Sequence, residues 1–193
     1  MRHFKRFFCL TVAAVMLFGS AGYTVHAGAD VKISEQEFVI FSERNNIKSQ
    51  DMRLKSDITE EQLREYLQRF PSLSGIECAL IEAQDEYNVN AIMLLAIIRL
   101  ESGNGRSSLA RNQNNLGGIT APRNSVTAFR SFDSKRDCVI YMAKLLGEQY
   151  LNETGRFFNG YTLLDINKKY SASTAWSTKV SEIMYEIQWR LGW

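Results

Sequence analysis

Hydrophobic residues occupy almost every position from Ala91 to Leu100, and this run ends in a single carboxylate, Glu101. A helix that is apolar on every side is normally buried, and Gly103 and Gly105 directly after it are a stop signal. The pattern therefore predicts a core helix with Glu101 partly buried where it ends, at the floor of a cleft. The helix dipole and partial burial both disfavour an ionised carboxylate there. A protonated carboxyl at this place is suited to act as the general acid that cleaves a glycosidic bond. The alternative is that Glu101 is a polar residue that only solvates the end of the helix.

Apolar residues at spacings of three and four predict helices on both sides of this segment. Capping-box patterns at Ser34, Thr59 and Thr162 mark three of the helix starts. Their apolar stripes are typical of a buried core rather than of a cofactor site. The predicted helices cover residues 34–45, 59–70, 75–87, 133–146, 162–170 and 176–191.

The pattern changes between residues 109 and 132. Asn and Gly residues gather at 112–118, which is typical of turns, and residues 126–132 show some two-residue alternation. This predicts a small β-lobe inserted after the helix that ends at Glu101. The expected fold class is therefore α+β and mostly helical.

The first residues have the pattern of a secretion signal. Arg2, Lys5 and Arg6 precede an apolar run over residues 7–18 that is too short for a comfortable membrane span. Small residues around Ala27 predict cleavage after that position, with an uncleaved anchor as the alternative. We therefore expect a signal peptide at residues 1–27, an N-terminal extension at 28–57 and one catalytic domain at 58–193.

Removing the signal changes the charge of the chain. Three of the 23 Lys and Arg residues and none of the 21 Asp and Glu residues lie in residues 1–27, which leaves 20 basic and 21 acidic residues. A net charge of −1 offers no basic field for nucleic acid. Both histidines, His3 and His26, also lie in the signal, which excludes Ser-His and Cys-His catalysis and a His-ligated zinc site. Cys78 and Cys138 remain, and the sequence leaves open whether they pair.

Four motifs in order resemble a known family. They are the run from Leu95 to Gly105, the loop Asn114-Asn-Leu-Gly-Gly-Ile119, the segment from Phe132 to Leu146, and the segment from Tyr170 to Val180. Together they resemble bacterial glucosaminidase domains, the peptidoglycan-cleaving endo-β-N-acetylglucosaminidases of glycoside hydrolase family 73. The resemblance implies a lysozyme-like fold with a glycan groove between a helical lobe and a β-lobe.

The resemblance also assigns roles to residues. Glu101 matches the general acid and Tyr170 the active-site tyrosine; the alternative for Tyr170 is an aromatic that packs on the core at a helix end. The positions that match the groove-lining loop are Asn115, Leu116 and Gly118, which also suit ordinary turns. Trp176 is either a platform for a sugar face or a core residue.

The chain departs from a scheme with two carboxylates, because no Asp or Glu lies between Glu101 and Asp133. Glycosidases often use a second carboxylate, which the inserted lobe lacks here. Asp133 could activate the water, or it could be a helix N-cap. The N-acetyl group of the substrate could act as the nucleophile with help from Tyr170, which we favour. The third outcome is a domain that only binds glycan.

The sequence therefore predicts a secreted, cell-wall-associated hydrolase that cleaves β-1,4 bonds after N-acetylglucosamine in peptidoglycan glycan strands. The alternatives are a lytic transglycosylase, against which the Asn-Asn-Leu-Gly-Gly loop speaks, and a non-catalytic glycan-binding module. We expect a monomer without metal or organic cofactor and without stable membrane insertion once the signal is removed.

Overall fold

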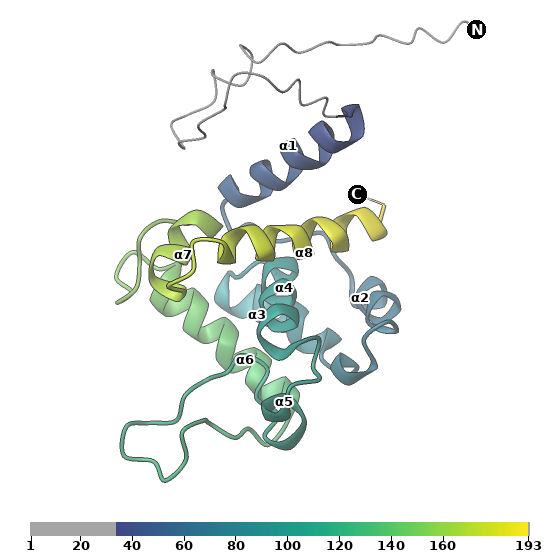
Figure 1. Cartoon of the computed structure of the whole chain (residues 1–193). Helices are drawn as coiled ribbons and strands as arrows, with labels where there is room; N and C mark the ends of the chain where they lie inside the picture. Colours follow the sequence, from purple (N-terminus) through teal and green to yellow (C-terminus); the bar gives the residue numbers. More distant parts are fainter. Residues whose placement is uncertain (1–33, 193) are drawn as a thin grey trace, which may run out of the picture. The chain divides into compact units, whose positions relative to one another are not determined.

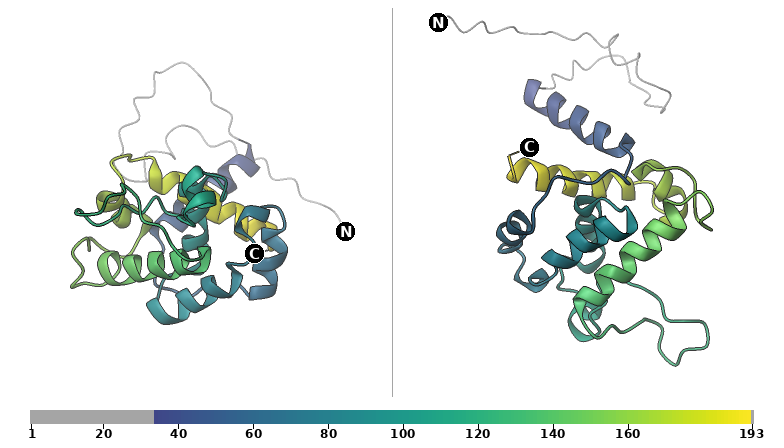
Figure 2. Two further views of the ribbon diagram at one scale, coloured as in Figure 1. Left: turned by 90° about the horizontal axis from the view of Figure 1, so that it is seen from below. Right: turned by 180° about the vertical axis from the view of Figure 1, so that it is seen from behind.

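The fold is known from a computed structural model that describes residues 34–192. The predicted signal peptide lies outside the described residues. The described chain folds into helices that surround α4 (Figures 1 and 2). In chain order the elements are α1 (Glu35–Ser49), α2 (Glu60–Leu67), η2 (Pro71–Leu73), α3 (Glu77–Tyr87), α4 (Ala91–Ser102), α5 (Ser108–Asn112), α6 (Lys135–Leu145), η3 (Leu146–Tyr150), α7 (Leu163–Tyr170) and α8 (Trp176–Arg190).

The three predicted capping boxes are confirmed. The side chains of Ser34, Thr59 and Thr162 each accept a hydrogen bond from the backbone N–H three residues later. The side chain of that later residue in turn accepts the backbone N–H of the cap residue. These bonds satisfy N–H groups that a helix start leaves without a partner. The first helix extends to Ser49 instead of ending near Asn45, because Ile47 is buried and α1 packs on α7 and α8.

Helix α4 is the centre of the core. Every residue from Ala91 to Ile98 is at most 1% exposed, and α3, α6 and α8 pack around the helix. Fully burying one Leu or Ile side chain contributes about 1.5–3 kcal/mol, so this helix contributes much of the hydrophobic stabilisation. The predicted buried helix is confirmed.

Helices α3 and α6 approach closely where α6 continues into η3. Gly147 makes this possible, because a Cβ atom there would lie 2.5 Å from the backbone oxygen of Tyr87. Residues before α2 belong to the same compact unit as the later helices, since Met52 is buried and the unit begins at Ser34.

The predicted β-lobe is wrong, because residues 34–192 contain no strand. The segment between α5 and α6 loops outward from the helices (Figure 1) and has one isolated antiparallel bridge, Thr120 to Phe129. Residues 122–129 are all exposed, so the loop has no core face against which strands could pack. A lone two-stranded ribbon is marginal without such packing. The mostly helical part of the predicted fold is confirmed, but the α+β class is not.

Two further observations bound the fold. No helix within residues 34–192 has the length and apolar character needed to span a membrane. The two cysteines of this part of the chain are free thiols, Cys78 exposed and Cys138 buried, so they do not form a disulfide.

Candidate active site

Glu101 stands in the last turn of α4, one residue before the helix ends. Gly103 ends the helix in the left-handed conformation at φ +58°, and its N–H bonds to the carbonyl of Arg99. Glu101 itself is exposed, so the predicted partial burial is wrong. The reason is that the last turn of α4 passes beyond the core, where Leu100 is already only partly buried.

The turn after Glu101 is held by a buried hydroxyl. Ser102 donates to the carbonyl of Ile98 at 2.6 Å and accepts the N–H of Gly105 at 2.7 Å. Gly105 has φ +77°, and a Cβ atom there would lie 2.8 Å from Cδ2 of Leu73. The Ser-Gly-Asn-Gly sequence therefore fixes the direction in which α4 ends, and with it the position of Glu101.

Arg99 ties this turn to α8. Its buried guanidinium donates to Oδ1 of Asn104 at 2.9 Å and to Oε2 of Glu186 at 2.6 Å, and it lies 4.1 Å from the ring centroid of Phe70. Burial alone would raise the pKa of Glu186, but hydrogen bonds from Arg99 and Arg190 outweigh it and lower that pKa. Sequence reasoning gave Arg99 no role, although it is the one charge inside the apolar run.

Trp176 holds the side chain of Glu101. The indole Nε1–H donates to Oε1 of Glu101 at 3.0 Å, and the indole ring is only 5% exposed. Behind it the ring of Tyr170 lies at a centroid distance of 4.6 Å, and that of Tyr150 lies 5.6 Å beyond Tyr170. The structure thus brings Glu101, Tyr170 and Trp176 into one cluster from α4, α7 and α8.

The phenol of Tyr170 is strongly held in its neutral form. Burial raises its pKa most, and the negative charge of Glu101 raises it further, with smaller contributions from Tyr150 and Cys138. Tyr170 therefore keeps its O–H as a hydrogen-bond donor at any physiological pH.

The predicted groove loop is a tightly bonded turn at the base of the segment after α5. Asn115 is buried, donates to the carbonyls of Ile119 at 2.9 Å and Arg130 at 2.8 Å, and accepts the N–H of Ile119 at 2.9 Å. Leu116 is fully buried, and Gly118 has φ +61°. The side chains of Asn115 and Leu116 therefore act by shaping this loop.

The loop base adjoins the cluster through Cys138. The N–H of Leu116 donates to Sγ of Cys138 at 3.2 Å, and burial raises the pKa of this thiol to about 11. Cys138 in turn lies near enough to Tyr170 to affect its pKa. A buried neutral thiol is a packing residue here rather than a nucleophile.

Asp133 is not joined to the cluster. It is exposed, and within residues 34–192 its carboxylate makes no hydrogen bond or ion pair with another residue. The N-cap of α6 is Ser134, whose hydroxyl accepts the N–H of Asp137 at 3.1 Å, so Asp133 does not cap the helix.

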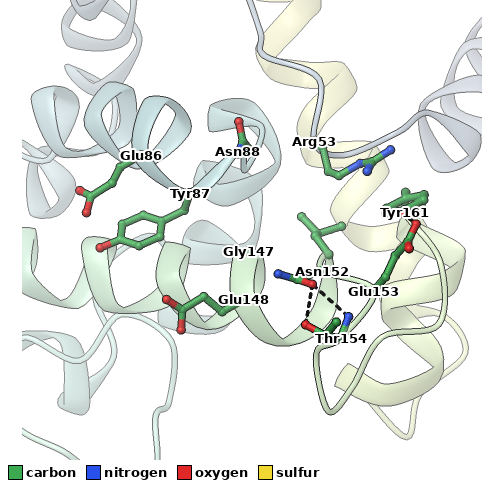
Figure 3. A pocket seen from close by; sticks show the side chains of 11 residues that line it. Arg53, Glu86, Tyr87, Asn88, Gly147, Glu148, Asn152, Glu153, Thr154 and Tyr161 are labelled. Atoms are coloured by element: carbon green, nitrogen blue, oxygen red, sulfur yellow. Dashed lines mark hydrogen bonds between the residues drawn. The ribbon is translucent and has the colours of Figure 1, made fainter.

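An open pocket of ≈ 590 Å³ lies away from Glu101, between the end of α3, η3 and the loop before α7 (Figure 3). In its wall Arg53 pairs with Asp51 and stacks 3.4 Å from the ring centroid of Tyr161, whose hydroxyl bonds to Glu153. No grouping of side chains in the described part of the chain could hold a metal ion.

The family model described as "Glucosaminidase: Mannosyl-glycoprotein endo-beta-N-acetylglucosaminidase" matches residues 78–189. The chain belongs to this family. That stretch includes α4, α7 and most of α8, and therefore the whole Glu101 cluster. The resemblance drawn from the four motifs is confirmed.

Two curated proteins of Streptococcus pneumoniae, from strains TIGR4 and R6, are each 34% identical over 112 residues. Both carry the name "Putative endo-beta-N-acetylglucosaminidase". The match covers 58% of this chain but only 17% and 16% of the two relatives, so the chain spans a small part of their length.

Solved structures with the same fold include autolysin E of Staphylococcus aureus. It is 21% identical with a TM-score of 0.60, and the match covers 86% of this chain and 83% of that one. A catalytic mutant of autolysin E in complex with the disaccharide NAG-NAM matches with a TM-score of 0.58 at 19% identity, over 76% of this chain and 73% of that one. A complex of autolysin E with the muropeptide NAM-L-ALA-D-iGLU matches with a TM-score of 0.57 at 20% identity, over 86% and 83%.

Proposed function

We propose that this chain is a secreted peptidoglycan hydrolase that cleaves the β-1,4 bond after N-acetylglucosamine, with Glu101 as general acid. The observation that carries the proposal is the hydrogen bond from Trp176 to Oε1 of Glu101 on an otherwise exposed carboxyl. The other oxygen, Oε2, makes no hydrogen bond within residues 34–192 and can carry the proton towards a bound glycan. The family and the glycan and muropeptide complexes of autolysin E support this substrate class.

In this mechanism the Oε2 proton of Glu101 passes to the glycosidic oxygen as the C–O bond breaks. The positive charge that develops on the sugar needs a nucleophile, and the segment from 102 to 132 offers no carboxylate for it. The carbonyl oxygen of the substrate's own N-acetyl group then attacks the anomeric carbon, and water later opens the ring that forms. The neutral O–H of Tyr170 donates a hydrogen bond that orients this group. Asp133 remains the alternative activator of water.

The test is Glu101→Gln on purified peptidoglycan, scored by release of reducing ends. Loss of a general acid reduces the rate by about 10²–10⁴-fold. Glu43→Gln is the matched control, because Glu43 is exposed on α1 and makes no hydrogen bond or ion pair within the described residues. Turnover by Glu101→Gln at the rate of the wild type would exclude Glu101 as the acid.

A lytic transglycosylase is the second candidate, favoured by the lack of a second carboxylate joined to Glu101. Such an enzyme needs one acid and leaves an anhydro sugar, whereas hydrolysis leaves a reducing N-acetylglucosamine end. Mass spectrometry of products from defined glycan strands decides between them. Binding to the polymer without any product would instead identify a glycan-binding module.

A further inference from the structure

The segment between α4 and α6 has a charge unlike that of the rest of the molecule. Residues 102–132, called here the arginine segment, contain no Asp or Glu and four arginines. The other described residues carry fifteen Lys and Arg against twenty Asp and Glu, a net charge of −5. These four arginines are Arg106, Arg111, Arg123 and Arg130.

The four arginines also differ in their partners. Nine of the fifteen other Lys and Arg residues in the described chain form ion pairs, whereas none in the arginine segment does. Arg106, Arg111 and Arg123 are exposed. Their charges are therefore available to an anionic ligand, and they are not consumed by the fold.

Arg130 shows how the arginine segment is anchored. Its guanidinium lies 4.5 Å from the ring centroid of Tyr141 on α6 and 5.9 Å from that of Phe132. Its carbonyl accepts from Asn115, which also binds Ile119, so the two arms of the loop are joined at their base. The exposed arginines are thus attached to a fixed base and not to a free chain end.

The arginine segment begins directly after Glu101, where α4 ends. Arg106 lies in the turn that follows, and its Nε–H donates to the carbonyl of Gly103 at 3.4 Å. Farther along the segment, the N–H of Leu116 donates to Sγ of Cys138 on α6. A polymer whose sugar chain lies at Glu101 therefore lies close to the unpaired positive charge of Arg106.

We infer that the arginine segment binds carboxylate-bearing peptide branches of the polymer whose glycan chain is cut at Glu101. The inference rests on the proposed function and narrows its substrate to glycan that still carries peptides. Guanidinium groups bind carboxylates with charge-assisted and often bidentate hydrogen bonds. The muropeptide NAM-L-ALA-D-iGLU bound by autolysin E is a ligand of this chemistry, since its D-iGLU residue carries a carboxylate.

The test measures binding in the full chain with Glu101→Gln, so that it does not depend on turnover. The variant Arg106→Gln/Arg111→Gln/Arg123→Gln is compared on two polymers that are immobilised on a solid support, both freed of phosphate polymers by acid. One is peptidoglycan with its peptides, and the other is the glycan strands that remain after an amidase has removed the peptides. Arg69→Gln is the control, an exposed arginine outside the segment with no ion pair in the described residues.

We expect the triple variant to bind peptide-bearing polymer about tenfold more weakly, since each exposed charge contributes about two- to threefold. Binding to peptide-free glycan should not change, and the triple Arg→Lys variant should recover most of the loss. Raising the salt concentration from about 0.1 M to about 1 M should weaken binding of the Glu101→Gln parent to peptide-bearing polymer, and it should not weaken binding of the triple Arg→Gln variant.

Equal binding of the triple variant and of its Glu101→Gln parent to peptide-bearing polymer would overturn the inference. An equal loss on both polymers would overturn it too, because the arginines would then contact sugar. Walls that retain their phosphate polymers form a third arm of the test, and a loss seen only there would assign the arginines to phosphate and also overturn the inference. Failure of the proposed function is seen in turnover and not in binding, because Glu101→Gln would then turn over like the wild type, or the wild type itself would give no product.

Discussion

The indole N–H of Trp176 points at Oε1 of Glu101 from 3.0 Å, across 75 positions of sequence. Glu101 lies in the last turn of α4 and Trp176 begins α8, so the carboxyl is fixed by two helices that pack on each other. An N–H donor on one oxygen leaves the second oxygen without a hydrogen bond in the described residues, as the role proposed for Glu101 as general acid requires. This relationship distinguishes an exposed acid with a set orientation from an ordinary surface carboxylate.

Trp176→Phe should keep the ring packing and lose the N–H. We expect the rate on peptidoglycan to fall about tenfold, the value of one hydrogen bond to a charged group. Trp189→Phe is the control, because Trp189 is 64% exposed on the same helix. An unchanged rate in Trp176→Phe would mean that Trp176 only fills space.

Tyr170→Phe tests the neutral phenol. The ring contacts with Trp176 and Tyr150 remain, so the melting temperature should change little, whereas kcat should fall about 10²-fold with KM nearly unchanged. Tyr161 lines the pocket between the end of α3 and η3, away from Glu101, so the control Tyr161→Phe should retain full activity. If Tyr170→Phe turns over normally, the phenol does not orient the N-acetyl group.

Gly105→Ala should destabilise the fold by about 3 kcal/mol. The residue has φ +77°, and the new Cβ would lie 2.8 Å from Leu73 and 2.9 Å from the backbone oxygen of Ser72. Gly103→Ala is a matched control, since it has φ +58° but no atom within 4 Å of its Cβ position, and should cost about 1 kcal/mol. Urea unfolding measures both; equal costs would contradict the close approach of Gly105.

Glu186 should make part of the stability depend on pH. Its folded pKa lies below the ordinary value of 4.5, so the folded chain holds the proton less tightly than the unfolded chain. The stabilisation is complete above about pH 5 and is lost as the pH falls through the folded value. Glu186→Gln should therefore have a lower melting temperature than the wild type at pH 7, because Arg99 loses its partner. Between pH 5 and pH 3 its melting temperature should fall less than that of the wild type. Parallel curves of melting temperature against pH for the two proteins would refute this.

Much of the helical fold follows from local patterns. The capping boxes at Ser34, Thr59 and Thr162, and the buried helix before Glu101, depend on residues that are close in sequence. The prediction of a β-lobe was wrong because alternation over seven residues makes a strand only where one face of the segment is packed. No local signal shows that residues 122–129 stay exposed.

The sequence by itself determined most of the helices, the family and Glu101 as the candidate acid, because apolar periodicity, helix stop signals and ordered motifs are all local or linear properties. Only the tertiary structure decided what surrounds Glu101. The Trp176 bond to Glu101 and the Arg99 contact with Glu186 each join α4 to α8, which are distant along the chain, and Tyr170 joins this cluster by stacking on Trp176. Such contacts depend on how the helices pack around α4, and no spacing along the chain specifies that packing.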